Sequence, residues 1–299
     1  MNYLVTGGAG FIGSNLVDAL IERGDKVRVI DNFSNGKKEN VNPKAELIIE
    51  DICNLEKIQP HFKGVDVVFH LAALPRVQFS IDYPKETNEV NVGGTLNVLL
   101  AARGAGVKRV VYSASSSAYG NNSNLPLKEE MKPVPMSPYG LQKFVSEEYA
   151  RIFPIFYKLE TVSLRYFNVY GPRMSAEGAY PTVIAVFLRQ KSEGKPLTIT
   201  GDGTQTRDYT HVRDVCRANI LAATSPNVGC GEVMNIGAGN NFSVNQIAEM
   251  IGGPVKHIEP RIEPHDTLAD NSLAKKLIGW EPKVSIEEGI DELKKIYGV

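Results

Sequence analysis

The chain has 299 residues, of which 42% are hydrophobic and 22% charged. This length is enough for one large core or two smaller ones, and the net charge of -1 gives no reason to expect nucleic acid or a membrane surface as a partner. No apolar run approaches the ~20 residues of a membrane helix. The first predicted strand begins at Tyr3, which leaves no room for a signal peptide, so we expect a cytoplasmic protein.

Short apolar runs alternate with longer segments of helical period over the first half of the chain. Runs rich in Val, Ile and Leu are typical of strands covered on both faces of a parallel sheet. We predict helices over 13–23 and 92–104, and strands over 3–6, 27–30, 47–50, 65–70, 110–113 and 161–165. The alternation predicts an α/β fold with a Rossmann-type, doubly wound parallel sheet.

After about residue 166 the pattern becomes less regular and richer in Gly, Pro and polar residues. We therefore predict a nucleotide-binding domain over 1–165 and a smaller α/β substrate domain mainly over 166–299. Part of the segment 208–236 is expected to return to the first domain. A ligand between the two parts is the expected arrangement.

A glycine-rich sequence, "TGGAGFIG", lies between the first strand and the first helix. Gly8, Gly10 and Gly13 fit the spacing GxGxxG. Residues without side chains let the backbone approach a pyrophosphate, whose charge then lies at the N-terminus of the helix. The motif predicts a dinucleotide site made by Gly7, Gly10, Phe11, Ile12 and Gly13.

Asp31 closes the second strand, 18 residues after Gly13. A carboxylate there accepts hydrogen bonds from the adenosine ribose and repels a 2′-phosphate, which favours NAD over NADP. The third and fourth strands end nearby in such a fold, the fourth in "HLAAL", whose small residues let a cofactor pack closely. The further cofactor contacts that we predict are Asn32, Asp51, Ile52, Leu71, Ala72 and Ala73.

Tyr139 and Lys143 stand four positions apart in "SPYGLQK", at the start of a predicted helix. Residues with this spacing project from the same helical face. An ammonium group beside a phenol stabilises the phenolate and lowers the tyrosine pKa from about 10. The pair is therefore predicted to act as a general base on a hydroxyl group, next to the cofactor.

Three serines, Ser115, Ser116 and Ser117, follow the fifth strand. Small hydroxyl side chains at the carboxyl end of a parallel strand lie where ligands bind in such sheets. One of the three is expected to share a hydrogen bond with a substrate oxygen and Tyr139.

Neither the cysteines nor the histidines suggest a metal site. Cys53, Cys216 and Cys230 form no CxxC motif and no Cys/His cluster, so we expect neither a disulfide framework nor structural zinc. His70 lies within a buried strand between Phe69 and Leu71, which favours a structural role.

Motifs along nearly the whole chain resemble those of the extended short-chain dehydrogenase/reductases, and among them the nucleotide-sugar 4-epimerases. They include "TGGAGFIGS", "FHLAA", "NVGGTLNVL", "SASSSAYG", "SPYGLQK", "LRYFNVYGPR", "GDGTQTRDYTHVRD" and "LIGWEPKVSIEEGI". The resemblance implies a catalytic triad of Ser115, Tyr139 and Lys143. The register of Ser115 with Gly120 selects it, and Ser116 is the second choice.

The resemblance also implies the reaction and the homodimeric state. Tyr139 removes the proton of the sugar 4-hydroxyl while hydride passes to NAD, and the 4-keto sugar then receives the hydride on its other face. Helices over 92–102 and 139–152 form the dimer interface of similar proteins, so we expect a homodimer. Gln142 replaces the serine that the family usually has before its lysine.

The resemblance places Asn168, Arg207 and Arg261 on the diphosphate of a UDP-sugar, and Ser116 near the sugar. In similar epimerases, a residue three positions before the Asp of "LAD" controls the space beside sugar C2, and in this chain that position is the small Thr267. We therefore expect UDP-GlcNAc and UDP-GalNAc to be accepted, together with UDP-Glc and UDP-Gal.

Three other functions remain in view. Nucleotide-sugar dehydratases carry an Asp-Glu pair where this chain has Ser116 and Ser117, which argues against dehydration. Epimerisation or decarboxylation of UDP-glucuronate stays open. A non-catalytic NAD-binding sensor is expected to lose the tyrosine or the lysine, and both are present.

Overall fold

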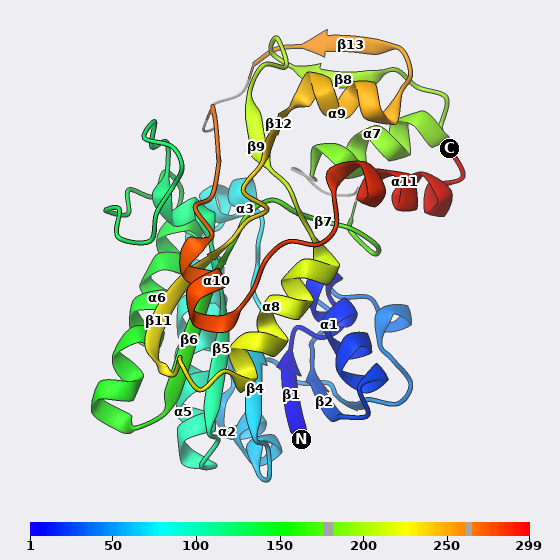
Figure 1. Ribbon diagram of the computed structural model, residues 1–299. Coiled ribbons are helices and arrows are strands. Elements are labelled where there is room, and N and C mark those ends of the chain that lie inside the picture. Colours follow the sequence, from blue (N-terminus) through cyan, green and yellow to red (C-terminus); the bar gives the residue numbers. More distant parts are fainter. Residues whose placement is uncertain (176–181, 261–264) are drawn as a thin grey trace.

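The computed structural model describes residues 1–175, 182–260 and 265–299. Seven parallel strands form its central sheet in the order β11-β6-β5-β4-β1-β2-β3 (Figure 1). The strands are β1 (Asn2–Thr6), β2 (Lys26–Ile30), β3 (Glu46–Ile48), β4 (Val67–His70), β5 (Arg109–Ser115), β6 (Glu160–Tyr166) and β11 (Cys230–Ile236). The predicted Rossmann-type parallel sheet is confirmed.

All six predicted strands are present, with different ends. The third stops at Ile48, two residues before the predicted end, and the next residue, Ile49, is 61% exposed. The seventh strand, β11, was not among the predicted strands. Its sequence "CGEVMNI" mixes apolar with polar residues, so it lacks the continuous apolar run of the others.

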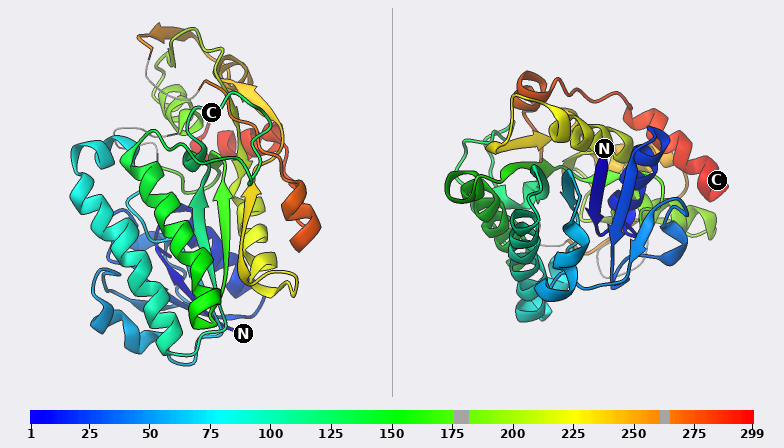
Figure 2. Two further views of the ribbon diagram at one scale, coloured as in Figure 1. Left: turned by 90° about the vertical axis from the view of Figure 1, so that its left-hand side faces the viewer. Right: turned by 90° about the horizontal axis from the view of Figure 1, so that it is seen from below.

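Helices cover both faces of the sheet. On one face α1 (Phe11–Glu22), α8 (Val212–Thr224) and α10 (Ser272–Ile278) enclose a core that includes the fully buried Trp280. On the other face α2 (Leu55–Ile58), α5 (Thr95–Gly104) and α6 (Pro138–Tyr157) enclose a second core, and Figure 2 shows α5 and α6 side by side. In the part of the chain that the structure describes, no helix is long and apolar enough to cross a membrane.

A smaller unit with its own core lies beyond the carboxyl edge of the sheet (Figure 1). Its helices are α7 (Val183–Ser192), α9 (Val244–Ile251) and α11 (Ile286–Tyr297), and its strands are β7 (Val169–Tyr170), β8 (Leu197–Thr200), β9 (Thr206–Asp208), β10 (Thr210–His211), β12 (Asn241–Ser243) and β13 (Val255–Ile258). Capping boxes begin both α9 and α11. Between these elements, α8 and β11 return the chain to the main sheet.

The predicted helix over 92–104 has two parts. A π-helical segment over Glu89–Gly94 precedes α5, which starts at Thr95. The backbone carbonyl of Asn91 accepts hydrogen bonds from the hydroxyls of Thr95 (2.6 Å) and Ser146 (2.8 Å). These side chains replace part of the usual helical bonding, and π segments of this kind frequently occur at functional sites.

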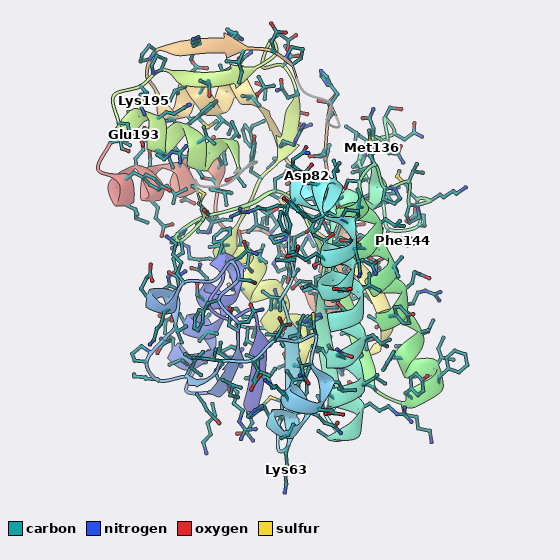
Figure 3. All side chains as sticks on the ribbon, turned by 180° about the vertical axis from the view of Figure 1, so that it is seen from behind. Lys63, Asp82, Met136, Phe144, Glu193 and Lys195 are labelled. Atoms are coloured by element: carbon teal, nitrogen blue, oxygen red, sulfur yellow. The ribbon has the colours of Figure 1, made fainter. Side chains whose placement is uncertain are left out.

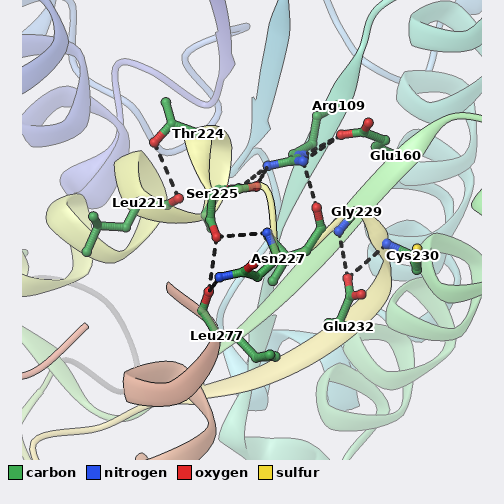
Figure 4. A network of polar contacts seen from close by, with 12 residues as sticks. Arg109, Glu160, Leu221, Thr224, Ser225, Asn227, Gly229, Cys230, Glu232 and Leu277 are labelled. Atoms are coloured by element: carbon green, nitrogen blue, oxygen red, sulfur yellow. Dashed lines mark hydrogen bonds and ion pairs between the residues drawn. The ribbon is translucent and has the colours of Figure 1, made fainter. Parts of the chain in front are cut away.

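Arg109, the first residue of β5, attaches the sheet to the loop between α8 and β11 (Figure 4). Its buried guanidinium donates to the carbonyls of Ala222 (2.8 Å), Ser225 (2.8 Å) and Val228 (2.6 Å), and it pairs with Glu160 at 2.6 Å. The planar group of arginine suits several acceptors at once, whereas a lysine ammonium does not.

We predict that Arg109→Lys lowers the free energy of unfolding by about 3 kcal/mol, because buried carbonyls lose their donors and the pairing geometry is lost. Urea denaturation followed by circular dichroism measures the change. Arg151→Lys is the matched control, since Arg151 pairs with Glu148 at the surface, and its effect should stay below about 1 kcal/mol. Equal effects of the two substitutions would contradict the assignment.

Candidate active site

The segments predicted to carry the chemistry follow the carboxyl ends of neighbouring strands. The glycine loop follows β1, Asp31 follows β2, and Leu71 follows β4. Ser115 is the last residue of β5, and Asn168 comes two residues after β6 ends. Because all these strands are parallel, the segments meet at one edge of the sheet, facing the smaller unit (Figure 1).

Close backbone packing explains the glycines of the loop. Gly7 has φ +72°, and a Cβ atom there would lie 2.7 Å from the backbone nitrogen of Ala72. A Cβ atom on Gly13 would lie 2.1 Å from the carbonyl oxygen of Gly7. Helix α1 begins at Phe11 without a side-chain cap on its N-terminal N–H groups. This cradle fits a pyrophosphate, and NAD would be held by the loop.

Asp31 also orders the glycine loop. Its buried carboxylate accepts hydrogen bonds from the backbone N–H groups of Ala9 (2.9 Å) and Phe33 (2.8 Å). Each oxygen retains acceptor capacity for a ribose hydroxyl. The side chain of Asn32 donates to Asp51 at 2.9 Å, so the structure brings together predicted contacts that follow β2 and β3. No sequence pattern predicted the hydrogen bond between Ala9 and Asp31.

The side chain of Ser115 lies beside Tyr139 and acts on the pKa of its phenol as a hydrogen-bonding neighbour. The hydroxyl of Ser117 donates to Ser115 at 2.8 Å, which fixes the Ser115 oxygen. Ser137 caps α6, the helix that carries Tyr139 and Lys143, by accepting from the N–H of Gly140 at 3.1 Å. Of the three adjacent serines, Ser115 is the one that acts on the pKa of Tyr139.

Burial acts on both members of the Tyr139/Lys143 pair. It raises the pKa of Tyr139 to about 12, while the hydrogen bond from Ser115 lowers it in part. Burial lowers the pKa of Lys143 to about 7. The ammonium donates to the carbonyl of Ser113 at 2.7 Å and lies over the ring of Tyr112. The direction for Tyr139 is thus opposite to the one predicted from the sequence, because desolvation outweighs the lowering effect of Ser115.

Gln142 belongs to a buried amide network that the sequence did not reveal. Its side-chain oxygen accepts from Asn91 at 2.9 Å, and its nitrogen donates to Thr87 at 3.0 Å. The Asn91 side chain also donates to the carbonyl of Leu74 (3.1 Å) and accepts from its N–H (2.8 Å). The network therefore joins α6 to the π-helical segment and to the loop after β4. The only sign of this network in the sequence was the polar Gln142 next to Lys143.

His70 has the structural role that its sequence context favours. Its two ring nitrogens form hydrogen bonds with the hydroxyls of Thr6 (2.7 Å) and Thr95 (2.9 Å). Burial lowers the pKa of His70 to about 3, so the imidazole is neutral at ordinary pH. Among the residues described, no cluster of His, Cys, Asp and Glu has the composition of a metal site.

Two of the predicted substrate residues touch. The Asn168 amide donates to the hydroxyl of Thr267 at 3.3 Å and to the carbonyl of Asp208 at 3.1 Å. Arg207, the neighbour of Asp208, donates from one guanidinium nitrogen to the carbonyls of Thr206 and His265, both at 2.9 Å. Both amide hydrogens of Asn168 thus have protein partners, which was not expected for a phosphate contact. Arg261 lies outside the described residues.

Comparison with known proteins agrees with this geometry. The model of the NAD dependent epimerase/dehydratase family matches residues 3–237. The crystal structure of a UDP-glucose 4-epimerase from Thermotoga maritima with UDP-glucose has a TM-score of 0.93 and 40% identity, covering 99% of each chain. A UDP-N-acetylglucosamine 4-epimerase from Methanobrevibacter ruminantium, in complex with UDP-N-acetylmuramic acid, has a TM-score of 0.94 and 38% identity, covering 98% of this chain and 97% of that one.

A third relative acts on an acidic sugar. A UDP-glucuronate 4-epimerase from Thermodesulfobacterium geofontis is 37% identical over 311 residues, covering 96% of this chain and 93% of the relative. The three relatives share the epimerase activity and differ in the hexose. The chain belongs to the NAD-dependent epimerase/dehydratase family, as an epimerase of the extended short-chain dehydrogenase/reductase type that uses NAD.

Proposed function

We propose that this protein inverts the configuration at C4 of a UDP-hexose through a 4-keto sugar. The placement of Ser115 at the end of β5 beside Tyr139, with Lys143 one turn along α6, is the observation that carries the proposal. These groups lie at the sheet edge next to the glycine loop, where a sugar and a nicotinamide can meet.

The chain's own residues move the proton. In its phenolate form, Tyr139 accepts the proton of the sugar 4-hydroxyl, and Ser115 holds the same oxygen by a hydrogen bond. The positive charge of Lys143 opposes the cost of forming a buried phenolate. When bound, NAD would supply the acceptor for the hydride from C4 and the donor for its return to the opposite face. Tyr139 then gives its proton back, so proton and hydride are both restored in each cycle.

The preferred hexose depends on the space beside sugar C2. Thr267 is small and partly buried, and Asn168 and the backbone N–H of Asp208 hold its hydroxyl from one side at 3.3 Å each. A residue of this size leaves room for an acetamido group. We therefore propose UDP-GlcNAc and UDP-GalNAc as substrates, together with UDP-Glc and UDP-Gal.

UDP-glucuronate is the second candidate substrate, because a relative of 37% identity is a UDP-glucuronate 4-epimerase. The same proton and hydride transfers at C4 would serve it.

Proton NMR distinguishes the candidates: the protein with NAD is incubated separately with UDP-GlcNAc, UDP-Glc and UDP-glucuronate, and the H4 couplings reveal the product. Absence of turnover with all three would refute the proposed function.

The outer side of the helix layer supports a homodimer. Leu141 and Phe156 of α6 are 51% and 70% exposed, and Figure 3 shows Phe144 on the side of α6 that faces away from the sheet. Such apolar exposure is typical of interfaces. Sedimentation equilibrium tests the proposal, since a dimer has twice the 32.8 kDa of one chain.

The three free cysteines agree with the reducing cytoplasm that we propose as the compartment of this protein.

Tyr139→Phe is expected to lower kcat by about 10²- to 10⁴-fold, because the proton acceptor is lost while the ring keeps its packing. The NMR assay with the preferred UDP-hexose measures the rate. Tyr149→Phe is the control, since Tyr149 lies on the same helix ten residues further on, packed against a core, and its activity should be unchanged. Full activity of the Tyr139 variant would remove this residue from the mechanism.

Thr267→Tyr is expected to abolish turnover of UDP-GlcNAc and to spare UDP-Glc, because the larger side chain fills the space beside C2. The ratio of kcat/KM for the two substrates is the measurement. Thr267→Val, which removes the hydroxyl but keeps the volume, should leave this ratio unchanged. An equal loss of both substrates in the tyrosine variant would disprove the volume argument.

A further inference from the structure

Asp208, at the end of β9, lies buried between three segments of the chain. Its carboxylate accepts hydrogen bonds from the backbone N–H groups of Ala238 (2.7 Å), Gly239 (3.0 Å) and Ala269 (3.0 Å). The packing leaves no spare room: a Cβ atom on Gly237 would lie 2.9 Å from a carboxylate oxygen of Asp208 and 2.4 Å from the Cβ of Ala269.

Two of these segments hold residues proposed to bind substrate. Arg207 precedes Asp208 directly, and Thr267 stands two positions before Ala269. The backbone of Asp208 contacts both other candidates: its N–H donates to the Thr267 hydroxyl at 3.3 Å, and its carbonyl accepts from Asn168 at 3.1 Å. Residues 99 positions apart in the chain, Asn168 and Thr267, are thereby held in contact.

We propose that Asp208 is a positioning residue for the UDP-sugar site, whose carboxylate clamps the turn after β11 and the segment around Ala269 against β9 so that Asn168, Arg207 and Thr267 converge. This inference rests on the proposed function. Asp208 itself need not touch the substrate, since its carboxylate oxygens are already occupied by backbone donors.

The free energy of folding alone does not explain a carboxylate at this position. Burial raises the pKa of Asp208 to about 6, although the three backbone hydrogen bonds lower it. A folded-state pKa above the unfolded value of about 3.9 means that the folded protein holds its proton more tightly. The stabilisation that the tighter proton binding gives to the folded protein is therefore fully present below about pH 4. It is lost as the pH rises from about 4 to about 6. The ionised side chain is kept at neutral pH despite this cost.

Asp208→Asn tests the proposal, because the amide nitrogen cannot accept from backbone N–H groups. Calorimetry with UDP and the NAD-loaded protein is expected to give a Kd at least about tenfold higher than that of the wild type. KM for the UDP-hexose should rise in parallel while kcat stays within about twofold. Unchanged affinity for UDP would overturn the proposal and leave the proposed function intact.

Asp214→Asn is the matched control. Asp214 is equally buried and accepts from the N–H groups of Lys283 (2.9 Å) and Val284 (3.0 Å), but it lies in α8 away from the substrate residues. It should change the melting temperature without changing the Kd for UDP. An equal rise of Kd in both variants would reduce Asp208 to a general structural residue and overturn the proposal.

Thr267→Val provides a second test if Asp208→Asn does not fold. It removes only the oxygen that joins Asn168 to Asp208, and a rise of about three- to tenfold in the Kd for UDP is expected. An unchanged Kd would contradict the proposed convergence. Failure of the wild-type protein to bind UDP at all would refute the proposed function, and this inference with it.

Discussion

The parallel pairing of β1, β2, β4, β5 and β6 decides where the reactive side chains of this protein lie. Parallel strands need long crossovers, so each loop that follows a strand begins at the same edge of the sheet. The glycine loop, Asp31, the segment after β4 and the serines after β5 become neighbours for this reason. The sheet itself brings these segments close, whether or not their side chains touch.

Burial then sets the acid–base character of the site. Tyr139 and Lys143 lie in surroundings that disfavour a charge on either one, which raises the pKa of the phenol and lowers that of the ammonium. In this arrangement the Lys143 ammonium is directed at the carbonyl of Ser113. The proposed proton transfer to Tyr139 therefore depends on charges brought by the bound ligands as well as on the protein's own groups.

The substrate side is assembled differently from the cofactor side. The residues predicted to bind the cofactor follow strands of one parallel sheet, whose order in space, β4-β1-β2-β3, differs from their order in the chain. Asn168, Arg207 and Thr267 come from three segments that meet at β9, where the Asp208 carboxylate accepts from N–H groups of the turn after β11 and of Ala269. A buried acceptor of this kind takes the place of the regular hydrogen bonding that a sheet provides.

Local patterns in the sequence determined the fold class, the six apolar strands, the glycine cradle and the pairing of Tyr139 with Lys143 on one helical face, because each depends on residues close together in the chain. The tertiary structure decided what depends on distant neighbours. It set Ser115 beside Tyr139, added the mixed strand β11 to the sheet edge, joined Gln142 to Asn91, and reversed the expected direction of the Tyr139 pKa. Desolvation and non-local hydrogen bonds cause these differences, and both arise only when segments far apart in the sequence pack together.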